Sequence, residues 1–209
     1  MRFIQLVRSI GAGPIGAGPI AAAFAAALIS APASGQTSID PPPGDWTHRG
    51  VAVSFPENVG PYKRGQATEF TSDGRDASVG YRYSNDDGVL TVTVYVYPDY
   101  SDLSCSQIFL DARNNVAEYR GAELSDQGFV SPPDGGDTDF GLGARYRLPA
   151  NSMREGYPAL ISDVYLYCPP GDKWLVKYRA SWTGSEATFP DVGSFLRRID
   201  WPADLRSGL

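Results

Sequence analysis

The chain has few of the residues that enzymes most often use for covalent or metal chemistry. Its 209 residues include one histidine, His48, and two cysteines. A Ser or Cys nucleophile needs a positioned base, usually histidine, and a zinc site needs several His or Cys ligands at short spacing. The chain has no Gly-x-Ser-x-Gly turn, no Walker loop, and no Gly-x-Gly-x-x-Gly after an expected strand. We therefore predict no cofactor, and we interpret His48, beside a proline-rich segment, as a solvated surface residue.

Positive charge is also scarce. The 24 Asp and Glu residues outnumber the 18 Lys and Arg residues, so the formal net charge is −6. Nucleic acids and anionic membrane surfaces are both bound through clustered Lys and Arg. We therefore expect neither nucleic acid nor an anionic membrane surface as a partner.

A long apolar run lies near the N-terminus, at residues 20–29. It follows a start that carries Arg2 and Arg8 and no acid, and small residues at 31–34 come after it. This order is typical of a secretory signal peptide over residues 1–33. Glycines and prolines at residues 11–20 interrupt any long helix, so we expect cleavage and no membrane span afterwards, with a retained N-terminal anchor as the alternative. Cleavage would remove two arginines and move the charge from −6 to −8.

The remaining chain has the size of one domain. About 175 residues can bury most of their apolar surface in a single core. Residues 34–50 include Asp40-Pro-Pro-Pro-Gly-Asp45 and are interpreted as an extended proline-rich linker. We expect one globular domain over residues 51–202 and a C-terminal tail over residues 203–209.

Alternation of apolar and polar residues predicts several strands. Residues 79–83 and 90–97 flank Asn85-Asp-Asp-Gly88, a loop of residues that tolerate left-handed backbone angles, and so predict a β-hairpin. Residues 164–168 and 174–182 predict a second, aromatic hairpin around a turn. Shorter strand signals lie at residues 51–55, 66–70, 124–130 and 144–148.

Two segments change to the helical period. Apolar residues over 105–119 recur three or four apart, and Ser104 and Gln107 fit a capping box at their start. Residues 189–199 repeat in the same way, with Pro190 suited to a first turn. We therefore predict the α+β class, with a single domain and a largely antiparallel β-sheet covered by two main helices, as in an α/β/α sandwich.

The order of these elements resembles the PsbP and DcrB group of small α/β/α sandwich proteins. The resemblance is carried by an early strand that ends at proline, Val51-Ala-Val-Ser-Phe-Pro56, and by the strand at 90–97 before an amphipathic helix. It is also carried by a last strand, Trp174-Leu-Val-Lys-Tyr-Arg-Ala-Ser-Trp182, before a closing helix. Members of that group are mostly accessory or binding proteins, so the resemblance implies binding rather than catalysis. It assigns no site residue.

The two cysteines predict a disulfide. Export places Cys105 and Cys168 where thiols are oxidised. Cys105 begins the apolar stripe of the first helix, and Cys168 ends a strand on the same side as Val164 and Leu166. The thiols meet in the core if that helix covers that strand face. Two buried free thiols, or a Cys105 activated by the helix N-terminus, are the alternatives.

Four tyrosines form a candidate binding patch. Aromatic residues on a strand most often belong to the core, and we expect this of the aromatic hairpin as well. A shallow patch would form if no helix covers their strand faces. Its residues would be Tyr95, Tyr97, Tyr165 and Tyr167.

An acidic, glycine-rich loop is the candidate for a metal. Asp134, Asp137 and Asp139 lie within six residues, and carboxylate oxygens are the ligands that calcium prefers. The spacing does not fit an EF-hand, so we expect a solvated acidic loop rather than a metal site.

The sequence therefore favours a periplasmic or secreted binding protein. We predict a monomeric, non-enzymatic binding, accessory or scaffolding protein of the cell envelope, whose partner is an envelope protein or a small molecule. The alternative is an envelope hydrolase, for example one directed at glycans, with two distant carboxylates as acid and base. A deep cleft with two facing buried acids would favour the hydrolase, and a shallow aromatic surface would favour binding.

Overall fold

A computed structural model of the chain describes residues 37–40, 42–136, 141–169, 171 and 173–206. All of them belong to one compact unit, residues 34–209. The strands are β1 (Thr37–Ile39), β2 (Trp46–Thr47), β3 (Ser54–Phe55), β4 (Asn58–Val59), β5 (Tyr62–Glu69), β6 (Ala77–Asn85), β7 (Gly88–Pro98), β8 (Glu123–Val130), β9 (Gly141–Leu148), β10 (Leu160–Tyr167) and β11 (Trp174–Trp182). The helices are α1 (Cys105–Ala117) and α2 (Val192–Leu196).

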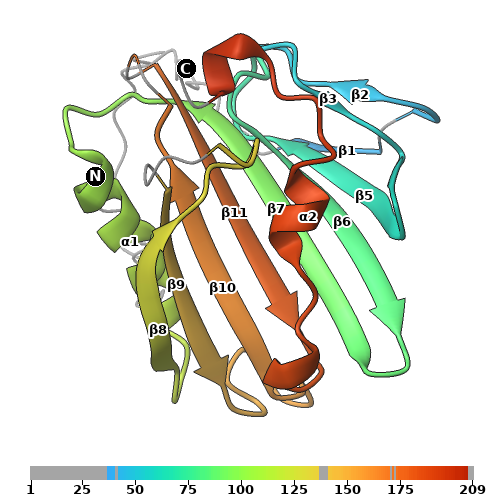
Figure 1. Cartoon of the computed structure of the whole chain (residues 1–209), viewed down its shortest axis with the longest axis vertical. Helices are drawn as coiled ribbons and strands as arrows, with labels where there is room; N and C mark the ends of the chain where they lie inside the picture. Colours follow the sequence, from blue (N-terminus) through green and yellow to red (C-terminus); the bar gives the residue numbers. More distant parts are fainter. Residues whose placement is uncertain (1–36, 41, 137–140, 170, 172, 207–209) are drawn as a thin grey trace, which may run out of the picture. The chain divides into compact units, whose positions relative to one another are not determined.

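Nine of these strands form one antiparallel sheet (Figure 1). Their order is β1-β5-β6-β7-β11-β10-β9-β8, with β4 paired to β5, and β2 and β3 form a separate pair. At the centre β7 pairs with β11, so that Val94 lies opposite Tyr178. The hairpins β6–β7 and β10–β11 were both predicted from the sequence, and both are confirmed.

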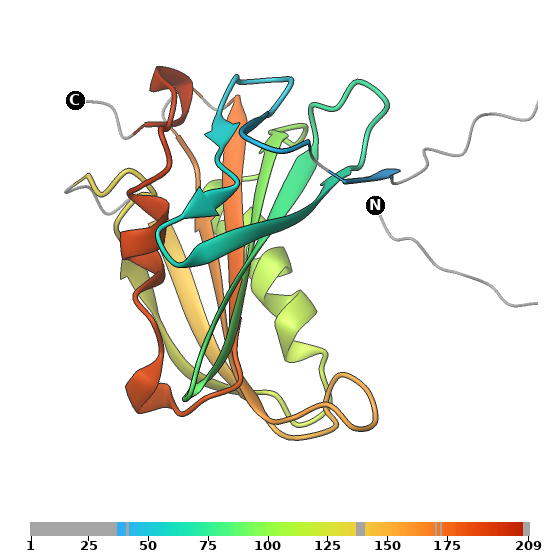
Figure 2. The same cartoon turned by 90° about the vertical axis from the view of Figure 1, so that its right-hand side faces the viewer.

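The two faces of the sheet carry two separate cores, because successive side chains of a strand point to opposite faces. Figure 2 shows α1 and α2 on opposite sides of the sheet, and we name the faces after these helices. The core on the α2 side includes Leu90, Val92, Val94, Val96, Val176, Tyr178, Ala180, Trp182, Phe195, Leu196 and Trp201. The core on the α1 side is formed by Phe109, Val116, Ala144, Tyr146, Leu148, Leu160, Val164, Leu166 and Leu175.

Helix α1 begins where its capping signal predicts. The backbone N–H of Ser104 donates to Oε1 of Gln107 at 2.9 Å, which supplies an acceptor at the start of the helix. Phe109 and Val116 are the buried residues of its apolar stripe. None of the helices in the described part of the chain is long and apolar enough to cross a membrane.

The second predicted helix is much shorter than residues 189–199. Phe189 is extended, with φ −60° and ψ 121°, because the following proline disfavours the helical conformation. Asp191 instead caps α2 by accepting from the backbone N–H of Ser194 at 3.1 Å. At the other end, the indole N–H of Trp201 donates to the carbonyl oxygen of Leu196 at 2.9 Å. The prediction of two main helices over the sheet was therefore wrong, and the domain is mostly β.

The described residues of the predicted linker, 37–40 and 42–50, belong to the domain and do not form a linker. Strand β1 pairs with β5 and forms one edge of the sheet, and β2 pairs with β3. The guanidinium of Arg64 donates to the carbonyl oxygens of Phe55 and Pro42, at 2.5 and 2.8 Å. Proline cannot donate a backbone hydrogen bond, but its carbonyl still accepts one. Composition alone was therefore misleading here.

Two smaller predictions, the strand at 51–55 and the tail at 203–209, are also corrected. The strand expected at 51–55 keeps only Ser54 and Phe55, because Ala52 has a positive φ of 54° inside a tight turn. The expected C-terminal tail includes a 3₁₀ turn over Ala203–Leu205, and Leu205 is fully buried. Its side chain joins the core on the α2 side, which fixes the 3₁₀ turn to the sheet.

Candidate functional site

Helix α1 covers only half of its side of the sheet. It packs against β9 and β10. Residues opposite one another on neighbouring strands share a face. The row of side chains that begins with Leu166 under α1 therefore runs across the sheet through Lys177, Tyr95 and Ser78. No described helix covers this continuation over β5, β6, β7 and β11. We call it the open face and define it by Gln66, Thr68, Ser78, Gly80, Arg82, Thr91, Thr93, Tyr95, Lys177 and Arg179.

A shallow groove of about 490 Å³ runs over the open face. Its floor is low because the residues in the middle are small: Gly80 lies opposite Thr93, and Ser78 lies opposite Tyr95. A Cβ atom added at Gly80 would meet only the carbonyl oxygen of Gln66, at an ordinary contact distance of 3.7 Å. A glycine with open space above it inside a strand marks a place where another molecule can approach the backbone.

One wall of the groove is aromatic. The rings of Phe70 and Tyr95 stack with centroids 6.3 Å apart and an angle of 23° between their planes. The ammonium group of Lys177 lies 4.3 Å from the ring centre of Tyr95 and 5.7 Å from that of Tyr97. Such cation–π contacts hold a lysine at a defined position above the rings. Burial lowers the pKa of Lys177, while the nearby carboxylate of Asp76 acts in the opposite direction.

Arg179 lies next to Lys177 on the same face, between the groove and the end of α1. Its Nε donates to the hydroxyl of Ser162 at 3.1 Å, and its Nη1 donates to the hydroxyl of Tyr119 at 3.4 Å. Its Nη2 is buried and has no hydrogen-bond partner among the described residues. Neither Arg179 nor Lys177 forms an ion pair with a carboxylate in the described part of the chain.

The four tyrosines predicted as one patch are divided between the two faces. Tyr165 lies opposite Tyr178, which lies opposite Val94 on the α2 side. Tyr165 stacks on Tyr178 with ring centres 4.5 Å apart, and Tyr167 is only 1% exposed. On the α1 side, Tyr97 packs against the core and only Tyr95 borders the groove. The single patch does not exist, because neighbouring strands do not bring these four side chains to one face.

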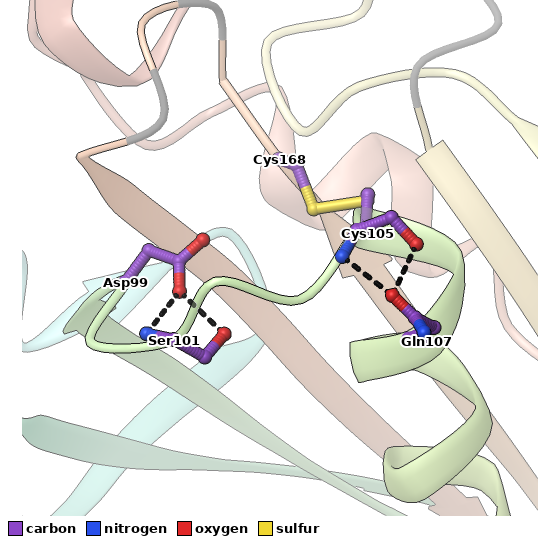
Figure 3. The surroundings of a disulfide bond; sticks show 6 residues. Asp99, Ser101, Cys105, Gln107 and Cys168 are labelled. Carbon is purple, nitrogen blue, oxygen red and sulfur yellow. Dashed lines mark hydrogen bonds between the residues drawn. A yellow bond between two sulfur atoms is a disulfide. The ribbon is translucent and has the colours of Figure 1, made fainter.

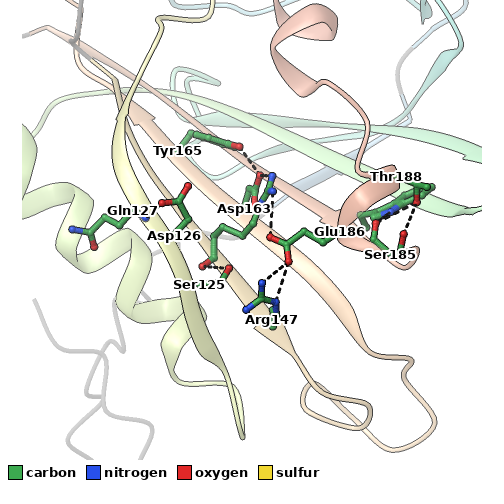
Figure 4. A network of polar contacts seen from close by, with 11 residues as sticks. Ser125, Asp126, Gln127, Arg147, Asp163, Tyr165, Ser185, Glu186 and Thr188 are labelled. Carbon is green, nitrogen blue, oxygen red and sulfur yellow. Dashed lines mark hydrogen bonds and ion pairs between the residues drawn. The ribbon is translucent and has the colours of Figure 1, made fainter.

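A buried acid on the α2 side belongs to a closed polar network (Figure 4). Asp163 is 1% exposed, and its two carboxylate oxygens accept from Nε and Nη2 of Arg145 at 2.7 Å each. The hydroxyl of Tyr165 also donates to this carboxylate, at 2.5 Å. Arg147 and Arg145 both face Glu186, at 2.6 and 3.6 Å. A carboxylate with both oxygens occupied by donors is suited to hold residues in place.

His48 is not a solvated surface residue, as the sequence had suggested, but is 1% exposed. Its Nδ1 accepts from the backbone N–H of Gly50 at 3.0 Å, and its Nε2 lies 3.1 Å from the carbonyl oxygen of Val96. The ring therefore acts as a neutral donor and acceptor that fixes the N-terminal segment to β7. Burial lowers the pKa of His48, because the charged form loses its hydration.

The predicted disulfide is present (Figure 3). Cys105 at the start of α1 is bonded to Cys168, which follows β10, and their Cα atoms are 6.1 Å apart. The structure describes no free cysteine. Of the candidate metal loop, Asp137 and Asp139 lie outside the described residues, and no group of three or more potential metal ligands occurs among those that are described.

Sequence reasoning did not assign a role to Lys177 and Arg179. Their alternation with apolar neighbours places them on the side of β11 opposite Val176 and Tyr178, and this part of the signal is visible in the sequence. The sequence does not show which strands neighbour β11 or where α1 ends. Comparisons with protein-family models, curated proteins and solved structures gave no match to this chain.

Proposed function

We propose that this chain is an exported, non-catalytic binding protein of the cell envelope that holds a carbohydrate on its open face. The observation that carries the proposal is the composition of the groove, which combines a stacked aromatic wall with a floor of glycine, serine and threonine. A chain of sugar rings offers both flat apolar faces and many hydroxyl groups. The proposed role is in line with the binding role implied by the resemblance to the PsbP and DcrB group.

The polar groups of the groove are of the kind that pairs with sugar hydroxyls. A sugar hydroxyl both donates and accepts, and so do the hydroxyls of Thr68, Thr91 and Thr93 and the amide of Gln66. The ring of Tyr95 is half-buried and supplies apolar surface with a defined orientation. Because the groove is shallow, a long glycan can pass over it without its end having to enter a closed pocket.

Export is supported by the Cys105–Cys168 disulfide. Such bonds persist where the surroundings are oxidising, as in the periplasm or outside the cell. The proposed signal peptide over residues 1–33 would deliver the chain there. We propose that the exported domain acts as a monomer.

Binding is favoured over glycan hydrolysis by the state of the buried acids. A hydrolase of the usual kind needs one carboxyl group as acid and a second as base or nucleophile. Asp163 is saturated by Arg145 and Tyr165, which leaves no free oxygen for a proton transfer. Oε1 of Glu69, which is also buried, makes no hydrogen bond within the described residues, but it lies 3.2 Å from Nε of Arg49 and so has a counter-charge beside it.

A valine placed on the groove floor tests the proposal. Gly80→Val introduces a residue that favours strands, and its Cβ atom has space at this position. The rest of the valine side chain would fill part of the groove. Gly128→Val on the edge strand β8 is the matched control, because a Cβ there meets nothing within 4 Å. Soluble oligosaccharides of neutral hexoses and of uronic acids are titrated by NMR and calorimetry.

We expect at least one class to shift the resonances of Gly80 and Thr93. Gly80→Val should weaken this binding at least tenfold, or about 1.4 kcal/mol, and Gly128→Val should leave it unchanged. The proposal is wrong if neither class binds, or if binding persists in Gly80→Val.

A further inference from the structure

We infer that the β11 end of the groove is a carboxylate subsite, so that the glycan bound there is acidic and carries uronic acid residues. This inference rests on the proposed function and names the class of carbohydrate. The subsite consists of the ammonium group of Lys177 and the guanidinium group of Arg179, with Tyr95 beside them.

The first argument is the placement of the two cations. Lys177 and Arg179 are two residues apart on β11, so both point to the α1 side. Lys177 lies opposite Tyr95, and Arg179 lies opposite Thr93, so each is next to a residue that lines the groove. A carboxylate over β11 would therefore lie between two positive groups while its sugar ring remains over β7.

The second argument is that the hydrogen bonds of these cations are incomplete. Arg179 is held in place by Ser162 and Tyr119, but its buried Nη2 has no partner among the described residues. Leaving a buried donor without an acceptor costs free energy, and it leaves the positive charge of this guanidinium group uncompensated beside the groove. The half-buried ammonium group of Lys177 contacts ring faces and donates to no acceptor in the described part of the chain.

The third argument is charge complementarity. The chain as a whole is acidic, with a formal charge of −6, yet the same side of the sheet also carries Arg82 and, directly opposite it, Lys63. Asp76 is the carboxylate that acts on Lys177, and it does not form a close ion pair with it. A local excess of cations on an acidic protein attracts an anionic ligand to this face.

An Arg and a Lys together also suit phosphate, so the test separates the two anions. The probes are a galacturonate hexasaccharide, a neutral cello-hexasaccharide and inorganic phosphate, each titrated at equal ionic strength. The variants are Lys177→Gln and Lys177→Arg, with Lys173→Gln as control, since Lys173 is exposed and lies outside the groove.

The galacturonate probe should bind at least tenfold more tightly than the neutral one. Lys177→Gln should bring the ratio of the two affinities close to one. Lys177→Arg should retain most of the preference for galacturonate, and Lys173→Gln should leave it unchanged. Added salt should reduce the ratio, since salt ions screen the attraction between the partly exposed cations and the anionic probe.

Each contrary outcome has a distinct meaning. Equal binding of the acidic and neutral probes would overturn the carboxylate subsite and leave the proposed function standing. Binding of neither probe would overturn both. Tight binding of phosphate without either sugar would overturn the carboxylate subsite in favour of a phosphate site. An unchanged affinity ratio in Lys177→Gln would also overturn it, because Lys177 would then not contact the carboxylate.

Discussion

Arg145 and Asp163 form a bidentate ion pair across neighbouring strands, with two parallel hydrogen bonds of 2.7 Å. The two residues lie directly opposite one another on β9 and β10. The side chain of Asp163 is 1% exposed and that of Arg145 is 27% exposed, so the pair is protected from water on one side. The same contact raises the pKa of Arg145 above its ordinary value.

Asp163→Asn should destabilise the domain, because the partly buried guanidinium of Arg145 loses the closer of its two counter-charges. Removing one partner of a buried ion pair costs about 3 to 5 kcal/mol of unfolding free energy. Because Arg145 is partly exposed, we expect a loss at the lower end of this range, about 3 kcal/mol. Urea unfolding followed by tryptophan fluorescence measures it. The control is Asp200→Asn, whose ion pair with Arg206 is exposed and should cost less than about 1 kcal/mol. A similar loss in both variants would contradict this prediction.

The buried His48 should make stability depend on pH. Its pKa is lowered in the folded protein and is near 6.5 when unfolded, so the unfolded chain binds the extra proton first. The stability from a neutral His48 is therefore complete above about pH 6.5 and falls as the pH drops below that value, until the folded pKa is reached.

Thermal unfolding of wild type and of His48→Gln from pH 8 to pH 5 checks this. The variant should be less stable at pH 8, by about 2 kcal/mol, because the paired contacts to Gly50 and Val96 are lost. The difference between the two proteins should shrink towards pH 5. A gap that is constant or that widens on acidification would refute the assigned neutral state.

Loss of the disulfide should weaken the domain without changing its fold. The bond joins residues 63 positions apart, and closing such a loop stabilises by roughly 4 kcal/mol in the chain-entropy model. The double variant Cys105→Ala, Cys168→Ala should therefore unfold at lower urea concentration and keep its circular dichroism spectrum. Wild type treated with reductant is the control and should move in the same direction. Two titratable thiols in denatured, unreduced wild type would show that the bond does not form.

The carboxylate subsite predicts how binding changes with pH. The pKa of Lys177 lies below its ordinary value of 10.5, because burial disfavours the charged form. Binding of an acidic glycan requires the protonated lysine, so affinity should fall as the pH rises towards this lowered pKa. Calorimetry of the galacturonate hexasaccharide between pH 6 and pH 10 measures the fall. Lys177→Arg should remove it, since arginine stays charged over this range; a flat wild-type profile would count against Lys177.

Features encoded by neighbouring residues were predictable from the sequence. The hairpin β6–β7 follows from alternation on both sides of Asn85 and Gly88, and the amide oxygen of Asn85 accepts from the backbone N–H of Gly88 at 3.1 Å. Helix α1 follows from its period and its capping residues. In each case the local preference and the tertiary packing agree.

Features that depend on distant contacts were not predictable. Trp46 and His48 are buried although they follow a proline-rich stretch. Trp46 packs against Phe55, while His48 contacts the ring of Trp174 and the carbonyl oxygen of Val96 on other strands. Predicting the open face requires knowing that β7 pairs with β11 and where α1 ends. A pattern in one segment carries no information on which distant segment lies beside it.

The order of strands also dictates how the chain can fold. Strands β5 to β7 form one meander and β8 to β11 form another, and among the described strands the two meanders pair with each other only where β7 meets β11. Each meander closes through contacts between neighbours in sequence, whereas the β7–β11 seam must wait for a strand near the C-terminus, which slows folding. A chain released before Trp174 would expose the unpaired edges of β7 and β10 and would aggregate through them. The domain can thus reach its native state only after β11, near the C-terminal end of the described residues, has been synthesised and is free to pair with β7.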